Sequence, residues 1–112
     1  METLTVFQRE CELRLLEQLA KFHVKPNSRS IIGEYEKYVC IVAISGDFKA
    51  YIYTDQPEFF YHGSWYGFEV PDYPDDRKRI DLFVEAVKSC LSGEEPSDTG
   101  TARVFFGRGR PL

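Results

Sequence analysis

Hydrophobic positions change their spacing twice along this chain of 112 residues. Across residues 5–23 they recur every three or four positions, and across residues 38–70 they alternate with polar residues or run together. Across residues 75–93 the helical spacing returns. A period near 3.6 indicates an amphipathic helix, whereas alternation indicates a half-buried strand. The pattern therefore predicts two helices that flank a block of strands.

The first predicted helix begins with a capping box, since Thr5 offers a hydroxyl at the N-cap and Gln8 follows three residues later. We expect it to end near His23, because Pro26 cannot easily continue a helix. Its main apolar face is formed by Phe7, Cys11, Leu15, Leu19 and Phe22. A thinner second stripe consists of Val6, Leu13 and Ala20. We interpret this stripe as an apolar edge under a neighbouring loop, with a partner surface as the alternative.

Residues 25–33 are rich in turn-forming types and are interpreted as a linker. The first strand is expected to begin at residues 34–37, and its centre at residues 39–44 is apolar on both sides, as in an interior strand. A turn at residues 45–47 leads into a second strand, in which Phe48, Ala50 and Ile52 form the core face.

Pro57 is expected to interrupt the strand ladder, because proline has no N–H to donate. Residues 58–62 and 65–70 then form a hairpin around Gly63 and Ser64. The predicted inward side chains of this hairpin are Phe60, Tyr66, Phe68 and Val70. The predicted outward side chains are Phe59, Tyr61, Trp65 and Glu69.

The second helix opens at residues 72–76, where acids and a proline suit a helix N-terminus, and it closes at Gly93. Its apolar face consists of Ile80, Phe83, Val84, Val87 and Leu91. Residues 102–106 are expected to add a short further strand.

The resulting order α-β-β-β-β-α-(β) has no βαβ alternation and predicts an α+β fold. We expect a single domain over residues 1–112, with residues 1–4 and 107–112 frayed. The sheet is expected to be antiparallel with four to five strands. Both helices should pack on one face of it, because that arrangement buries all the apolar surfaces together.

Composition narrows the class of protein. Hydrophobic residues make up 43% of the chain and charged residues 29%, as in soluble globular domains. The net charge of −4 argues against a nucleic-acid partner. No apolar run approaches the ~20 residues of a membrane span, and no secretory signal is evident, so we expect a cytoplasmic protein without a membrane partner. The cysteines Cys11, Cys40 and Cys90 lie far apart and are interpreted as buried structural thiols.

No set of residues matches a catalytic or metal-binding motif. The histidines His23 and His62 lack other ligands at metal spacing. The pair Asp75 and Asp76 is explained by capping at a helix start. We therefore expect neither an enzyme, nor a metal site, nor a cofactor.

The remaining candidate is a surface for another protein. Strand alternation places tyrosines and the single tryptophan on the outward sheet face, with carboxylates around them. This predicted partner-binding set is Tyr51, Tyr53, Asp55, Glu58, Tyr61, Trp65, Glu69 and Asp72. Tyrosine and tryptophan are enriched at binding hot spots, and an acidic rim favours a basic partner. Sheet stabilisation by cross-strand aromatic pairs and packing in a homodimer are the alternatives.

The segment WYGFEVPDYPDD followed by the helix RIDLFVEAVKSCL resembles small α/β immunity proteins of bacterial polymorphic or contact-dependent toxin systems. The resemblance covers roughly residues 35–91 and implies an antitoxin that inhibits a cognate toxin, often a basic nuclease, by blocking its active site. Two alternatives remain open. One is a dimeric acidic secretion chaperone, and the other is a small-molecule-binding domain with His62 and the tyrosines around a pocket.

Overall fold

A computed structural model describes residues 4–68 and 75–94 of the chain and the backbone of residues 103–106. The helices are α1 (Val6–Lys21), the short 3-10 helix η1 (Ile44–Gly46) and α2 (Asp76–Leu91). The strands are β1 (Pro26–Ile32), β2 (Tyr38–Ala43), β3 (Phe48–Ile52), β4 (Pro57–Tyr61), β5 (Ser64–Gly67) and β6 (Arg103–Phe106). The predictions for Glu69, Val70 and Asp72 and for the frayed residues 1–3 and 107–112 lie outside the described residues.

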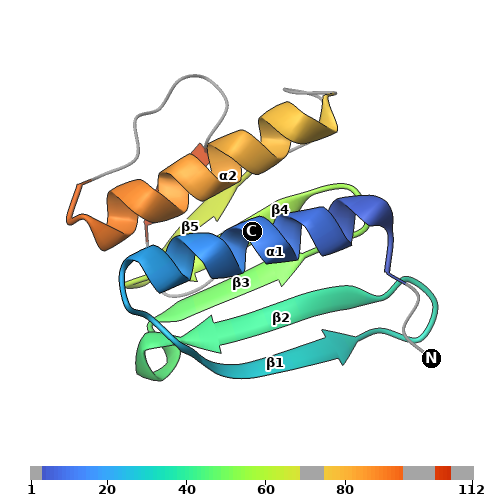
Figure 1. The fold of residues 1–112 in the computed structure, drawn as a ribbon, viewed down its shortest axis with the longest axis horizontal. Coiled ribbons are helices and arrows are strands. Elements are labelled where there is room, and N and C mark those ends of the chain that lie inside the picture. The colour runs from blue at the N-terminus through green and yellow to red at the C-terminus, as the bar shows by residue number, and fades with distance from the viewer. Residues whose placement is uncertain (1–3, 69–74, 95–102, 107–112) are drawn as a thin grey trace.

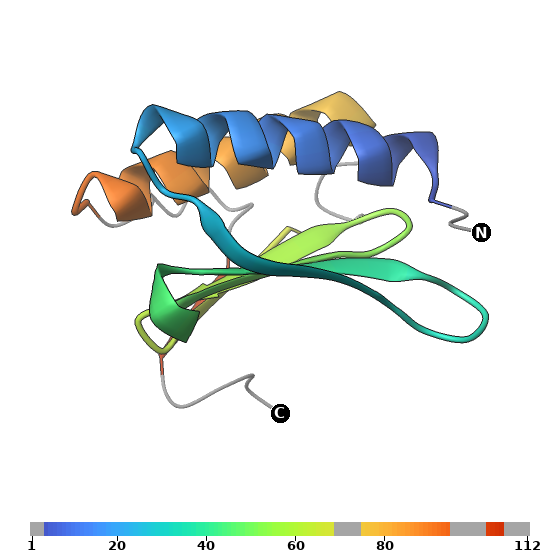
Figure 2. The same ribbon diagram turned by 60° about the horizontal axis from the view of Figure 1, so that its bottom comes forward.

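The strands form one antiparallel sheet in the order β1-β2-β3-β4-β5-β6. Neighbours in the sheet are thus neighbours in the chain (Figure 1). Both α1 and α2 lie on the same side of this sheet (Figure 2). The predicted α+β class and the placement of both helices on one face are confirmed.

The core lies between the helices and the sheet. From α1 it takes Phe7, Cys11, Leu15 and Leu19, and from α2 it takes Ile80, Phe83 and Val87, all of them predicted. In the sheet the pairs Val39–Ile52, Ile41–Ala50 and Ala43–Phe48 point toward the helices. The interior position predicted for the strand at residues 39–44 is confirmed, because β2 lies between β1 and β3.

The sheet contains one strand more than the hydrophobic pattern indicates. Residues 26–32, which we interpreted as part of a linker, form β1 and pair with β2. All of these residues except Ile31 are exposed, so β1 carries no apolar alternation from which it could be recognised. The segment 33–37 is a connection, and β2 begins at Tyr38 rather than at Glu34.

The orientation predicted for β4 was wrong. Pro57 does not interrupt the ladder but is the first residue of β4, opposite Ile52. This register puts Phe59 opposite Ala50, so Phe59 is fully buried under the helices while Phe60 points to the other face. Tyr61, on the same side as Phe59, packs against the core and does not join the outward face.

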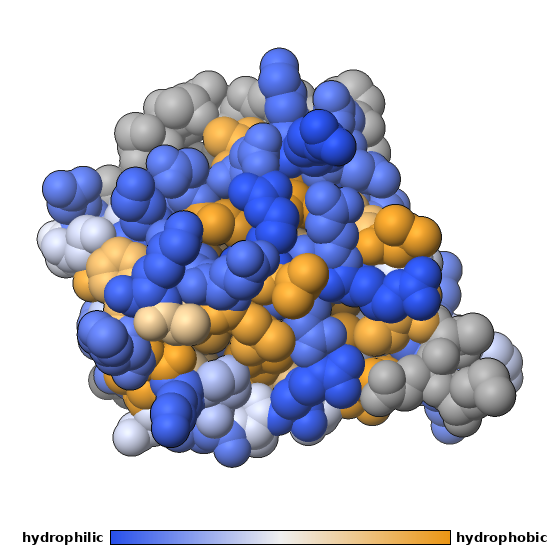
Figure 3. Space-filling model, in the orientation of Figure 1, coloured by the Kyte–Doolittle hydropathy of each residue, from blue (hydrophilic) through white to orange (hydrophobic). Residues whose placement is uncertain are grey.

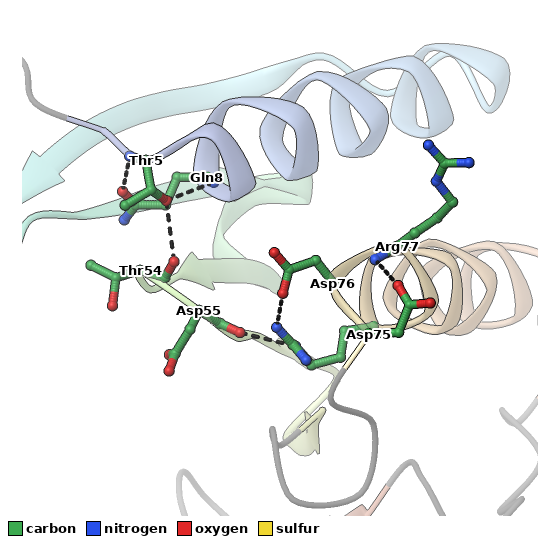
Figure 4. Close-up of polar contacts among 8 residues, drawn as sticks. Thr5, Gln8, Thr54, Asp55, Asp75, Asp76 and Arg77 are labelled. Carbon is green, nitrogen blue, oxygen red and sulfur yellow. Dashed lines mark hydrogen bonds and ion pairs between the residues drawn. The ribbon is translucent and has the colours of Figure 1, made fainter.

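The turn between β3 and β4 anchors the start of both helices (Figure 4). The hydroxyl of Thr5, the N-cap of α1, donates to the carbonyl of Thr54 at 3.1 Å. Arg79 in the first turn of α2 donates from Nε to the carbonyl of Asp55 at 3.0 Å. These contacts hold the starts of both helices at one end of the sheet.

Candidate binding face

The sheet face opposite the helices carries side chains from four neighbouring strands. No helix in the described ranges 4–68 and 75–94 lies over it (Figure 2). The strand registers place the following side chains on this face: Tyr38, Cys40 and Val42 of β2, Lys49 and Tyr51 of β3, Glu58 and Phe60 of β4, and Trp65 of β5.

Four aromatic residues, Tyr38, Tyr51, Tyr53 and Phe60, form a continuous aromatic tract on this face. The Tyr38 ring lies 6.2 Å from that of Tyr51 and 5.1 Å from that of Tyr53. Tyr51 meets Phe60 edge-on at 5.8 Å. All four side chains are half-buried, so each keeps part of its ring accessible. Rigid aromatic surface of this kind loses little side-chain entropy on binding.

Trp65 lies on the predicted face but does not offer the predicted surface, because it is only 5% exposed. Its ring lies along its own strand over Gly67, where a Cβ would come within 2.5 Å of ring atoms. Trp65 therefore packs down onto the sheet. Across the β4–β5 ladder it pairs with Phe60 of the tract.

The predicted acidic rim is only partly assembled in the described residues. Glu58 is 4% exposed, and its carboxylate accepts a hydrogen bond of 3.0 Å from the Tyr53 hydroxyl. Asp55 is exposed in the turn next to Tyr53. Lys49 adds an exposed cation to the middle of the face. The face therefore combines aromatic surface with a buried carboxylate and one charge of each sign.

Burial shifts the pKa of two groups on this face. It raises the pKa of the Cys40 thiol and of the Tyr51 hydroxyl, which hydrogen-bond to each other. Both groups are already protonated near pH 7 at their ordinary pKa values of 9.0 and 10.0, and burial extends the protonated range to higher pH.

Sequence reasoning missed two members of the tract, Tyr38 and Phe60. Tyr38 was placed within a strand and given no facing. The position of Phe60 was inverted, because we took Pro57 as a break. The signal that could have placed them is the pairing of Pro57 with Ile52, which fixes the facing of every residue in β4.

On the helix side, a cavity of about 250 Å³ lies between the β4–β5 hairpin and the end of α2. It is lined by Tyr61, His62, Ser64, Tyr66, Cys90, Gly93 and Glu94. His62 adopts φ 50°, in the left-handed region, and its Nδ1 lies 3.4 Å from an Asp47 carboxylate oxygen. Within residues 4–68 and 75–94, no cluster of His, Cys, Asp or Glu is arranged to hold a metal ion.

Comparison of the chain with protein-family models, curated proteins and solved structures finds no match. In the part of the chain that the structure describes, no helix has the length and apolar character needed to cross a bilayer.

Proposed function

We propose that this protein is a protein-binding inhibitor, an immunity protein that neutralises a cognate bacterial toxin in the cytoplasm. The observation that supports this most directly is the aromatic tract of Tyr38, Tyr51, Tyr53 and Phe60 on the sheet face that carries no helix. A tract fixed on a rigid sheet can fill a cleft of the toxin without reorganising.

Charge favours a basic toxin. The chain carries 18 acids and 14 basic residues, and Asp55 is exposed beside the tract. Carboxylates beside an aromatic centre speed the encounter with a cationic partner and orient it. A nuclease, whose active-site cleft must attract phosphates, has the complementary charge.

The first test is capture of the partner followed by an assay of its toxicity. The tagged protein is used to isolate a stoichiometric partner from the bacterium that encodes it, and the partner is then expressed alone and together with this chain. We expect growth arrest by the partner alone and rescue on co-expression. A partner that is harmless alone, or a toxin that co-expression does not neutralise, would contradict the proposal.

The second test assigns the face. Tyr38→Ala combined with Tyr51→Ala removes two rings of the tract and should weaken partner binding by more than about tenfold, as expected for hot-spot aromatics. Tyr35→Ala is the matched control, because Tyr35 is 94% exposed and lies in the β1–β2 connection. Equal losses in both variants, measured by calorimetry, would remove the tract from the interface.

A second candidate function rests on the cavity beside His62. Its volume of about 250 Å³ and its mixture of hydroxyl, imidazole and carboxylate groups suit a small polar ligand. A metabolite screen by thermal shift checks this function, since a ligand that binds only the folded chain raises its melting temperature. The effect should disappear in His62→Ala and persist in His23→Ala.

A further inference from the structure

Among the described residues, no strand pairs with the outer edge of the sheet at β1. β1 pairs with β2 on one side only and ends the strand order. Among the described residues, no backbone hydrogen bond outside the β1–β2 ladder involves β1. Such an edge presents unpaired N–H and C=O groups that can accept another strand.

Two features that protect a sheet edge from further pairing lie at the start of β1. Pro26 removes one donor, and the register with β2 shifts between Pro26 and Ser28. From Ser28 to Ile32 the pairing with β2 is regular. These five residues are therefore the stretch on which a further strand can form a ladder.

A partly apolar groove runs beside this edge, between β1 and the flank of α1. It has a volume of about 340 Å³ and is lined by Leu4, Arg9, Glu12, Leu13, Leu16 and Arg29. Leu13 is 60% exposed, although leucine is normally buried. Figure 3 shows apolar surface between α1 and β1 on this side of the molecule. Every second side chain of a strand added to β1 would point into this groove.

The charges around the edge select the occupant. Residues 18–33 contain Lys21, Lys25 and Arg29 but no acid. Glu12, the acid in the groove, is bound by Arg29 through two of its guanidinium nitrogens. Glu34 and Glu36 follow in the β1–β2 connection, so an added strand gains attraction for acidic residues at the Lys25 end of this edge. A second copy of β1 would instead bring a second set of the same cations, Lys21, Lys25 and Arg29, to this edge.

We propose that β1 and the adjoining α1 flank form a second interaction site, which binds an extended acidic peptide by strand addition. The peptide pairs with the backbone of residues 28–32, places alternate apolar side chains against Leu13 and Leu16, and directs carboxylates toward Lys25. The groove of this site lies on the helix side of the sheet, whereas the aromatic tract lies on the opposite face, and the site does not depend on the toxin proposal.

The experiment selects peptides from a displayed random library of 12-residue peptides on the immobilised full-length protein. We expect enrichment of sequences that alternate apolar and acidic residues. The best peptide, synthesised and labelled, should bind with an affinity that falls about tenfold in Lys25→Glu and in Leu13→Lys, as for charge reversal at an interface. Lys78→Glu, at an exposed site on α2, is the matched control and should bind normally.

Hydrogen exchange then locates the peptide, which should slow exchange of amides within residues 28–32. Circular dichroism confirms that the variants are folded, as expected for changes at exposed positions. Three results would overturn the proposal: no enrichment of acidic alternating sequences, binding that Lys25→Glu leaves unchanged, or protection confined to other strands. A protein that dimerises through β1 in sedimentation would also overturn it, because the edge would then be occupied by a second copy.

Discussion

At the scale of single residues, long polar side chains hold the elements together. Gln8 is fully buried, and its Nε2 donates to the carbonyls of Lys37 at 2.7 Å and Ile52 at 3.2 Å. Its Oε1 accepts from the Thr5 N–H at 2.8 Å, which completes the predicted capping box. The local half of this arrangement could be predicted from the spacing of Thr5 and Gln8. The distant half could not, because it depends on where two strands end.

Arg79 is the clearest case of a buried charge that must be satisfied. It is 2% exposed, its guanidinium lies 5.5 Å from the centre of the Phe7 ring, and it pairs with Asp76 and the Asp55 carbonyl. We expect Arg79→Lys to lower the free energy of unfolding by about 1–3 kcal/mol, since lysine lacks the planar fork that reaches several acceptors. Urea denaturation measures this effect. Arg77→Lys, at an exposed site, should change stability by less than about 0.5 kcal/mol.

Phe83 tests the packing of α2 on the sheet. Its ring is fully buried and meets Phe59 and Phe68, each edge-on at 5.8 Å. Phe83→Ala should lower the free energy of unfolding by about 3–5 kcal/mol, because it removes a large apolar side chain and leaves a cavity. Leu82→Ala, at a partly buried neighbour, should cost less. A midpoint of urea unfolding close to that of the parent would contradict the described core.

At the scale of elements, helices and strands were predicted correctly where one buried face leaves a periodic pattern of apolar residues in the sequence. The helices α1 and α2 follow their predicted faces because each buries one side only. β1 was missed because its residues are nearly all exposed, and β4 was inverted because Phe59 and Phe60 have the same hydrophobicity. The register with β3 decides which side chains of β4 point toward the helices. That register depends on both strands, so it cannot be predicted from the sequence of β4 alone. Of the predicted binding set, Tyr51, Tyr53, Glu58 and Trp65 lie on the outward face, whereas Tyr61 lies on the helix side.

The packing within β5 gives a spectroscopic prediction. Gly67→Ala puts a methyl group where the Trp65 ring lies, so the ring must move. We expect a loss of about 1–3 kcal/mol in the free energy of unfolding and a red shift of the emission of Trp65, the single tryptophan. Gly46→Ala is the control, since no atom lies within 4 Å of the added Cβ there. That variant strains its turn, where φ is 91°, but it should leave the emission maximum in place.

At the scale of the whole molecule, stability should fall in alkaline solution. Burial raises the pKa of the Cys11 thiol far above its ordinary value of 9.0, so the folded state keeps the proton that the unfolded state loses. The stabilisation is complete below pH 9 and decreases above it by about 1.4 kcal/mol per pH unit for this group. Urea titrations at pH 8 and pH 10 measure the decrease. In Cys11→Ala the decrease should be smaller, although its stability at pH 8 is already lower.

The order of strands in the sheet has a consequence for synthesis on the ribosome. Each strand from β2 to β5 pairs with the strand made just before it, so the meander can grow by short steps as the chain emerges. α1 is made first, yet its N-cap hydroxyl bonds to Thr54, 49 residues later, and Gln8 bonds to Ile52. The apolar face of α1 therefore stays uncovered until β3 has left the ribosome. During that interval Leu15 and Leu19 of the nascent chain are accessible to chaperones, because the sheet that buries them has not yet formed.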